Sequence, residues 1–531
     1  MIAVKPVFKR WAPEWLIRGT IFIVILPCLL LFGLSTANPN AAAGYYGIEP
    51  ADVQYSMIIF YAAVASFFAL ERRFFVYLAT KEYFLVGIIL QIVTSYICYN
   101  THNLHTLFIF RFIQGMANCG TTSICITLIF SRIQSERARE IGYSIFYGML
   151  LCISPISMLL TAPIVDAYDY NFLYKAIIFC YLPGAILLLY IMNTVRLNRK
   201  IPLYQVDWAS FVIYALVLCL IGYVLAYGQQ YYWLQDKRIV RSCGAILVLL
   251  LIHILRQLNL KRPSQNMEVF KYRNYIVGVF LIFVLYIVRG ALNITNLYFA
   301  TVLGMDPIHI AYIMAANIVG IVISILISSR LLILKRPMRL IWIYGFGLLL
   351  IFHTWMIFLF NTQADASTFI IPLIVQGMGA GMLMTPVIVF AVSSVPERLG
   401  GTASAVGVFF RFLGFCSSIA LINFYQLYNR TNHINRFQEH ITSLNPVAVE
   451  KLEMYKRGLV GKGVSTGQAA KIAQGLLGRS IETQAQLRSA IDYYTVISGL
   501  LIVVILIIAL IPYINRTIIN LKSKQPAPIS Y

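Results

Sequence analysis

Three arginines interrupt long apolar stretches of this sequence, namely Arg111, Arg289 and Arg411. A charged side chain at the centre of a bilayer costs roughly 2.5–3.5 kcal/mol on insertion scales, so each arginine should face a cavity or a partner. The acidic residues, by contrast, all fall at or beyond the ends of the apolar stretches. A cavity shared by these arginines would be electropositive, which favours an anionic or zwitterionic solute over a lipophilic cation.

The most distinctive of these arginines begins a polar stripe. Arg289, Asn293 and Asn296 follow the spacing i, i+4, i+7, which places them on one face of a helix. One hypothesis is that this stripe recognises a solute. The other is that it forms an interhelical hydrogen-bond network that is already satisfied within the protein.

A duplicated pattern contains a second group of polar residues. Gln-Gly-Met occurs at Gln114–Met116 and again at Gln376–Met378, each time inside a long apolar run. Small residues, a further apolar run and Glu-Arg follow both copies, at Glu136-Arg137 and at Glu397-Arg398. The same order at a nearly constant offset indicates a duplicated unit. It makes Gln114 and Gln376 matching candidates for solute binding.

The elements that position these residues are predicted to be membrane-spanning helices. The 531 residues are 60% hydrophobic and only 12% charged, whereas a soluble domain is about 45–50% apolar and about 25% charged. A span needs about 20 apolar residues. This criterion predicts an all-α polytopic membrane protein with fourteen spans, at residues 15–36, 54–71, 83–100, 104–131, 139–163, 171–193, 207–227, 238–256, 274–300, 308–330, 338–360, 368–394, 401–427 and 491–515.

The basic residues indicate the orientation of the spans. If the N-terminus is cytoplasmic, most Lys and Arg fall in the inner loops, and the short outer loops hold only Lys175, Lys237, Arg238 and Arg241. This asymmetry is typical of the positive-inside rule, and it explains the net charge of +22 without nucleic acid. We therefore expect both termini on the cytoplasmic side. Segment 428–490 then lies outside, where we predict two short amphipathic helices packed on the outer surface.

The duplication also divides the chain. Six spans lie in residues 1–199, two in an insertion at 200–260, and six in 261–531, which includes the outer loop 428–490. Two parallel halves related in this way place a solute site between them, near the middle of the membrane. The nine cysteines occur singly and without a metal-binding spacing, so we expect packed thiols, no metal and no cofactor.

Several motifs in this order resemble the major facilitator superfamily, specifically its fourteen-helix drug:proton antiporter branch (the QacA/EmrB type). The resemblance covers nearly the whole chain, and its closest matches are RFIQG at 111–115, Asp207-Trp208, GMGAGMLMTP at 377–386 and GTASAVGVFFRFLG at 401–414. It implies a major facilitator fold of two six-helix bundles plus two inserted helices.

The resemblance also implies roles for the arginines. Arg111 and Gln114 are similar to the family's helix 4 motif, which is associated with coupling. A structural arginine held by helix-end carbonyls is the alternative. Arg289 lies in the first helix of the second half, which lines the pathway in this superfamily. Arg411 lies where the family often has an arginine, and both binding and packing remain open for it.

Gating and coupling residues are predicted less directly. Gly377, Gly379 and Gly381 precede Pro386; they indicate either a flexing gate or, as the favoured hypothesis, close helix packing. Pro155 should kink its helix, because proline removes a backbone donor and clashes with the preceding turn.

Two further titratable residues are coupling candidates alongside Arg111. Glu71 is the acid nearest to mid-span. His353 lies within a span and could relay protons near neutral pH, although a hydrogen-bonded structural histidine is the favoured hypothesis.

Together these features predict a secondary transporter of small molecules rather than an enzyme. The chain has no phosphate-binding Gly-x-x-x-x-Gly-Lys-Ser/Thr loop, and the resemblance implies proton-driven efflux across a bacterial inner membrane. Because the antiporter signature Gly-Pro-x-x-Gly-Gly is absent, uptake or facilitated diffusion of an anion is the first alternative. A transport-inactive sensor or assembly partner is the second. The expected partners are the small-molecule substrate, the lipid bilayer, protons and a periplasmic adaptor protein, and we expect no nucleic acid.

Overall fold

The computed structural model describes residues 6–37, 39–133, 138–195, 207–260, 262–442 and 444–510, without the side chains of 35–37, 72–77, 138 and 139. Glu136 and Arg137 of the duplicated pattern lie outside these residues. Within them, fourteen helical segments are long and apolar enough to cross a membrane. This finding confirms the predicted fold class.

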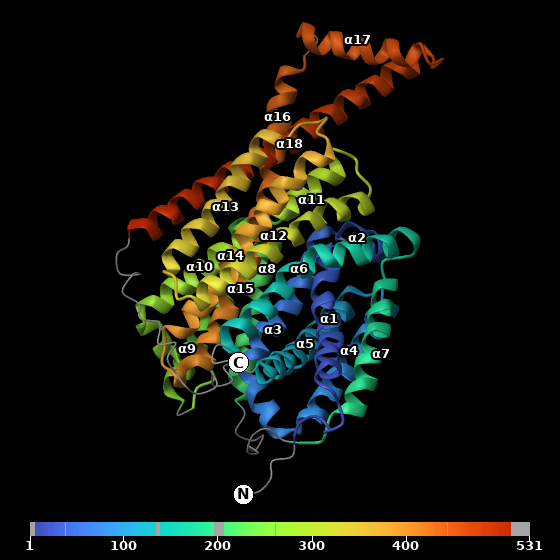
Figure 1. The fold of residues 1–531 in the computed structure, drawn as a ribbon. Helices are drawn as coiled ribbons and strands as arrows, with labels where there is room; N and C mark the ends of the chain where they lie inside the picture. Colours follow the sequence, from blue (N-terminus) through green and yellow to red (C-terminus); the bar gives the residue numbers. More distant parts are fainter. Residues whose placement is uncertain are drawn as a thin grey trace, which may run out of the picture.

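The spans correspond to named helices in chain order, drawn in Figure 1. They are α1 (Glu14–Ala37), α3 (Pro50–Tyr77), α4 (Thr80–Asn100), α5 (Leu104–Arg132), α6 (Ala138–Ala167), α7 (Phe172–Ile191), α8 (Trp208–Tyr227), α9 (Lys237–Asn259), α10 (Arg273–Arg289) with α11 (Ala291–Thr301), α12 (Pro307–Ile333), α13 (Met338–Leu359), α14 (Ile370–Ser393), α15 (Gly400–Asn423) and α18 (Thr466–Leu510). The short helix α2 (Pro39–Tyr46) follows α1, and α16 (Arg430–His440) and α17 (Pro446–Val460) precede α18.

The helices pack as two groups. Helices α1 and α3–α7 contact one another in the first group, α10–α15 and α18 do so in the second, and α6 against α12 and α3 against α15 join the two. An even number of spans puts the start of α1 and the end of α18 on the same side, which we call the inner side. The outer side is the one that carries α16 and α17 (Figure 1).

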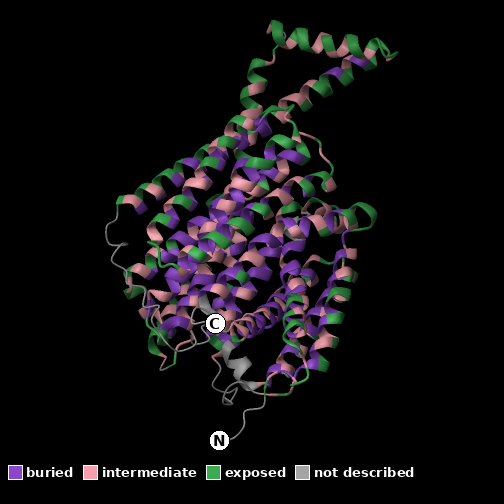
Figure 2. Cartoon of the chain, in the orientation of Figure 1, coloured by how far each residue is buried: buried purple, intermediate pink, exposed green. Residues whose placement is uncertain are grey.

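Burial follows the pattern of a protein in lipid. Buried residues concentrate in the middle of the helical body, and exposed residues lie along its outside (Figure 2). Many of these exposed side chains are large and apolar, among them Ile186, Leu247 and Phe358. A bilayer would cover such side chains at no hydrophobic cost, so the outer surface fits a membrane environment.

Two matching glycines let helices within each half approach closely. A Cβ added at Gly115 of α5 would lie 2.3 Å from the backbone oxygen of Phe60 in α3. A Cβ added at Gly377 of α14 would lie 2.2 Å from the backbone oxygen of Asn317 in α12. No real Cβ tolerates such a distance, so each glycine is required by the contact. The duplication therefore repeats a packing contact.

The remaining candidates for a gate in α14 are also packed against neighbours. A Cβ at Gly379 would lie 2.7 Å from the side chain of Leu349, and one at Gly381 would lie 2.1 Å from the Ser324 hydroxyl. Pro386 is buried inside the same helix. These contacts support the packing hypothesis, and a gating motion of these residues stays a prediction.

The inserted helices α8 and α9 contact each other, and α8 also contacts both halves. Helix α8 contacts α3 and α15 as well as α9. At its start, Asp207 accepts hydrogen bonds from the Ser210 backbone and from Arg256 of α9, the latter at 2.9 Å. Burial opposes ionisation of this carboxyl, but these hydrogen bonds and the nearby guanidinium outweigh burial and lower the pKa of Asp207.

The outer segment differs from the prediction. The second predicted amphipathic helix is continuous with the last span, because α18 runs unbroken for 45 residues, a length of about 68 Å. Helix α17 pairs with the first part of α18, and this pair extends away from the helical body (Figure 1). The prediction of packing on the outer surface is therefore wrong. No proline interrupts residues 466–510, so the helix continues straight out of the membrane.

Candidate functional site

A cavity of about 270 Å³ lies between the two helical groups. Helices α1, α3, α5 and α6 line it from the first half, and α10, α11, α12, α14 and α15 line it from the second. The described lining residues include two arginines, Arg289 and Arg411, and no aspartate or glutamate. The predicted electropositive opening between the halves is therefore present.

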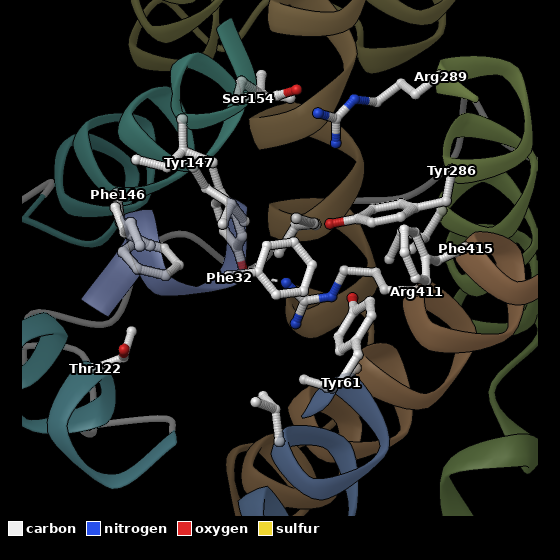
Figure 3. A pocket seen from close by; sticks show the side chains of 18 of the residues that line it. Phe32, Tyr61, Thr122, Phe146, Tyr147, Ser154, Tyr286, Arg289, Arg411 and Phe415 are labelled. Carbon is white, nitrogen blue, oxygen red and sulfur yellow. Dashed lines mark hydrogen bonds between the residues drawn. The ribbon is translucent and has the colours of Figure 1, made fainter. Parts of the chain in front are cut away.

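Arg411 projects from α15 toward the first half. Its Nη1 donates to the Tyr147 hydroxyl of α6 at 3.3 Å, and its guanidinium carbon lies 5.6 Å from the centre of that ring. Figure 3 shows the hydroxyls of Tyr61 and Tyr147 directed toward this guanidinium group. Arg411 therefore joins α15 to the opposite half while it lines the cavity, a position that suits both solute binding and the coupling of the halves.

Arg289 lies at a break in its helix. The predicted span 274–300 consists of α10, which ends at Arg289, and α11, which begins at Ala291, with Gly290 between them. A Cβ at Gly290 would meet the Ser418 side chain at 1.6 Å, so the break packs against α15. Interrupted helices are a recurring feature of solute sites in transporters.

The polar stripe is only partly at the cavity. Arg289 and Asn293 line it, whereas Asn296 does not. Asn296 lies in α11, three residues beyond Asn293 and toward the outer end of that span. The guanidinium carbon of Arg289 is 5.5 Å from the centre of the Tyr286 ring. The guanidinium group of Arg289 points into the cavity (Figure 3).

Gln376 lies at the cavity with one end of its amide already bonded. Its side-chain oxygen accepts from Asn317 Nδ2 at 2.5 Å, and the same Nδ2 donates to the Leu373 carbonyl at 2.8 Å. The buried Nε2 of Gln376 has no hydrogen-bond partner among the described residues. A buried donor without a partner costs about 1–3 kcal/mol, which a solute oxygen could recover.

Aromatic rings form much of the wall. Phe32 of α1, Tyr61 of α3 and Phe415 of α15 form a cluster in which the Phe32–Tyr61 and Tyr61–Phe415 ring centres are 5.4 and 5.6 Å apart. All three line the cavity, and so does Pro155 of α6, next to Ser154 (Figure 3). The cavity therefore combines cationic groups with flat apolar surfaces.

Arg111 and Gln114 do not line the cavity, which corrects the prediction for both residues. Arg111 is completely buried within the first half, where it donates to Gln114 Oε1 at 2.9 Å and lies 4.6 Å from the Phe60 ring. Gln114 in turn donates to Ser95 of α4 at 3.0 Å. These side chains contact Phe60 of α3 and Ser95 of α4 within the first half. They hold one bundle together through side chains rather than through helix-end carbonyls.

The two coupling candidates also lie outside the cavity. Glu71 is completely buried near the inner end of α3, close to Tyr83 of α4. Cys119 lines the cavity and lies close enough to Glu71 to interact electrostatically with it. His353 is buried in α13, where its Nδ1 donates to the Leu349 carbonyl at 2.7 Å. This contact favours the structural hypothesis for His353.

Several lining residues were not singled out from the sequence. Asn118 and Asn317 both line the cavity and bond to backbone oxygens of neighbouring helices, Asn118 to Cys28 at 3.1 Å. One signal was available for Asn118, which follows Gln114 by four residues and so shares its helix face. No comparable pattern marked the aromatic lining residues, because tyrosine and phenylalanine occur throughout the spans.

The cavity extends toward the inner side, and hydrogen bonds join the two halves beyond its outer end. Its lining extends to Phe130, near the inner end of α5, and to Ala403, near the inner end of α15. Beyond its other end, Gln54 of α3 and Asn423 of α15 exchange hydrogen bonds at 2.9 and 3.2 Å. Asn423 also donates to the Ala226 carbonyl of the inserted helix α8 at 3.0 Å. One asparagine thus joins three parts of the chain at the outer end.

Replacing Asn423 with alanine is expected to favour opening of the outer side. The substitution removes three hydrogen bonds, each with a net contribution of about 0.5–1.5 kcal/mol, so the open population should rise about tenfold or more. Spin labels at the outer ends of α3 and α15 would report a longer distance. Asn171→Ala is the matched control, because that amide bonds to Tyr99 within one half. An unchanged distance in Asn423→Ala would show that the pair does not hold this end closed.

Comparison with known families supports the fold. The family model described as Major Facilitator Superfamily matches residues 20–418. Similar sequences include the colistin resistance protein EmrB of Acinetobacter baumannii, 22% identical over 412 residues, which span 77% of this chain and 78% of that protein. The multidrug export protein EmrB of Escherichia coli is 21% identical over 427 residues, 80% of each chain.

Solved structures show the same architecture. A POT family transporter in complex with 5-aminolevulinic acid matches with a TM-score of 0.62 at 14% identity, covering 96% of this chain and 99% of that one. A POT family transporter in complex with a thioalcohol conjugated peptide matches with a TM-score of 0.61 at 14% identity, over 95% and 97% of the two chains. At this identity the likeness concerns the fold alone.

Proposed function

Because this multi-pass membrane protein belongs to the major facilitator superfamily and is a transporter, we propose that it exports small organic anions or zwitterions, driven by a proton gradient. The observation that carries the proposal is the charge of the cavity. Arg289 and Arg411 line it, and no carboxylate does so among the described lining residues. A desolvated guanidinium group favours a carboxylate or phosphate of the substrate and disfavours a lipophilic cation.

Two further observations support export as the direction of transport. The lining of the cavity extends toward the inner side, and Gln54 and Asn423 are hydrogen-bonded beyond its outer end, so we take this state as one that binds substrate from the inner side. The similar proteins named above are described as resistance and export proteins. With the inner side as the cytoplasm of a bacterium, as the basic inner loops indicate, this state would take up substrate for export through the inner membrane.

We take the two bundles as the moving units. Residues 1–199 and 261–531 rock about the cavity, and the insertion 200–260 follows through the contacts of α8 with α3 and α15. The aromatic walls supply stacking surfaces that tolerate several ring systems, while the arginines select for charge.

Flux in proteoliposomes tests the proposal. Carboxyfluorescein serves as the anionic probe and a rhodamine ester as the cationic probe, each with and without an imposed pH gradient. We expect gradient-dependent movement of the anion and little movement of the cation. An anion flux that is the same with and without the pH gradient would instead support facilitated diffusion. That outcome would agree with the missing antiporter signature. Zero flux of every probe would support a transport-inactive sensor.

We assign the proton site to Glu71. It is a fully buried acid at the inner end of a span, close to Tyr83 of α4 and to the cavity-lining Cys119, and intramembrane acids commonly carry protons in transporters. Glu71→Gln cannot exchange a proton. We therefore expect its anion flux under a pH gradient to fall to the rate seen without one, measured in the same vesicles.

A second buried acid provides the control for this test. Glu140, at the start of α6, is also buried, and Glu140→Gln should keep its gradient dependence. If Glu71→Gln retained full acceleration by the gradient, the proton site would have to lie elsewhere.

We also propose that α17 and the first part of α18 contact a periplasmic adaptor protein. This pair extends away from the membrane body (Figure 1) and exposes apolar residues, among them Val447 and Met454. Cross-linking from position 454 in whole cells tests this contact, and a product that contains only this chain would count against it.

A further inference from the structure

A second hollow lies between α1, α5 and α6 on the inner side, away from the central cavity. Its volume is about 420 Å³. Arg18 and Arg132 line one end, and apolar side chains form the rest, among them Ile21, Ile25 and Met149. The hollow therefore has a cationic end and an apolar body.

The two ends lie at different depths in the membrane. Arg18 is four residues into α1 and Arg132 is the last residue of α5, so both are at the inner ends of their helices. Ile25 is seven residues further along α1 than Arg18, which is about 10 Å deeper. The apolar body thus extends from the inner surface toward the hydrocarbon core.

Aromatic residues mark the level of the cationic end. Trp11 and Trp15 are both exposed just before and at the start of α1, and the Trp11 ring lies 5.0 Å from that of Tyr190 at the inner end of α7. Tryptophan and tyrosine concentrate at the level of lipid headgroups. The two arginines therefore lie near the headgroup region, and the apolar body lies beneath it.

The local charge is positive. The Glu14 carboxylate pairs with Arg132 at 2.7 Å and with Arg18 at 3.9 Å, so two guanidinium groups share one carboxylate. Arg132 also lies 4.8 Å from the Phe8 ring, and its buried Nε has no hydrogen-bond partner among the described residues. An anion at this end would add a counter-charge and accept further hydrogen bonds.

We propose that this hollow binds an anionic phospholipid of the inner leaflet. The headgroup phosphate lies against Arg18 and Arg132, and one acyl chain extends along Ile21, Ile25 and Met149. The hollow combines cationic groups at headgroup depth with an apolar slot that suits an acyl chain, and a phospholipid has both matching parts. A free phosphate would occupy only the cationic end of the hollow.

The site lies directly behind the transport cavity. Ile129 of α5 and Met149 of α6 line the hollow, whereas Phe130 of α5 and Leu150 of α6 line the cavity. A bound lipid would therefore pack against two of the helices that form the transport site, on faces adjacent to those that line the cavity. The proposal does not depend on the identity of the transported solute.

Native mass spectrometry of the full chain in non-ionic detergent tests this site. Phosphatidylglycerol and phosphatidylcholine are titrated separately, and we expect the anionic lipid to bind about tenfold more tightly. In the double variant R18Q/R132Q this preference should disappear. Arg330→Gln is the matched control, because Arg330 is exposed at the inner end of α12, and it should keep the preference.

Two further measurements distinguish a bound lipid from a free phosphate. Ile145→Trp keeps both arginines but fills the apolar slot, to which Ile145 belongs, so it should weaken binding of both lipids. Glycerol 3-phosphate should not displace phosphatidylglycerol. Unchanged preference in the double variant, or displacement by glycerol 3-phosphate, would overturn the proposal.

Discussion

Replacing Arg411 with glutamine is expected to lower kcat/KM for an anionic substrate by about 10- to 100-fold. A hydrogen bond to a charged group contributes about 1.5–3 kcal/mol, and every 1.4 kcal/mol corresponds to about a factor of ten. Arg411 lines the cavity and donates to Tyr147 of the opposite half, so the substitution removes both a substrate contact and a link between the halves. Initial flux rates in proteoliposomes at several substrate concentrations give this ratio.

Three matched variants separate the charge from the packing. Arg411→Lys keeps the positive charge but not the planar group, so it should recover part of the rate. Tyr147→Phe removes the hydrogen bond at 3.3 Å but retains the ring, so its effect should be smaller. Arg289→Gln removes the other cavity cation and should act in the same direction as Arg411→Gln. Loss of cationic-dye flux in Arg411→Gln, with anion flux intact, would contradict the charge assignment.

Substituting alanine for Gly377 is expected to destabilise the fold by about 3 kcal/mol. Overpacking usually costs about 1–3 kcal/mol, and here the added methyl carbon would lie 2.2 Å from the backbone oxygen of Asn317. A backbone atom cannot rotate away as a flexible side chain can, so helices α12 and α14 would have to separate. Gly115→Ala should behave similarly, because its Cβ would lie 2.3 Å from the Phe60 oxygen. Thermal unfolding in detergent measures both effects.

The control for this prediction is a glycine with free space around it. A Cβ at Gly347 of α13 would meet nothing within 4 Å, and alanine is preferred over glycine in a helix by about 1 kcal/mol. Gly347→Ala should therefore be neutral or slightly stabilising. Equal stability of Gly377→Ala and Gly347→Ala would show that α12 and α14 can adjust without cost. Such plasticity would in turn favour the gate hypothesis for Gly377, Gly379 and Gly381.

The sequence by itself determined the spans, the fold class and the presence of charges inside the membrane. Those features are local: each span is a run of about 20 apolar residues, and an arginine within such a run is visible without a partner. The sequence did not determine that α18 continues beyond the membrane. A helix can extend out of the bilayer into water, so the end of its apolar run does not mark the end of the helix.

Only the tertiary structure decided which arginine meets the cavity. Arg111 and Arg411 look alike in sequence, since each interrupts an apolar helix. Arg111 points into its own bundle, onto Phe60, whereas Arg411 points across the gap to Tyr147. The difference arises from the rotation of each helix about its axis and from the depth of the residue along it. Both depend on contacts between residues far apart in the sequence, 264 positions in the case of Arg411 and Tyr147, which no local pattern encodes.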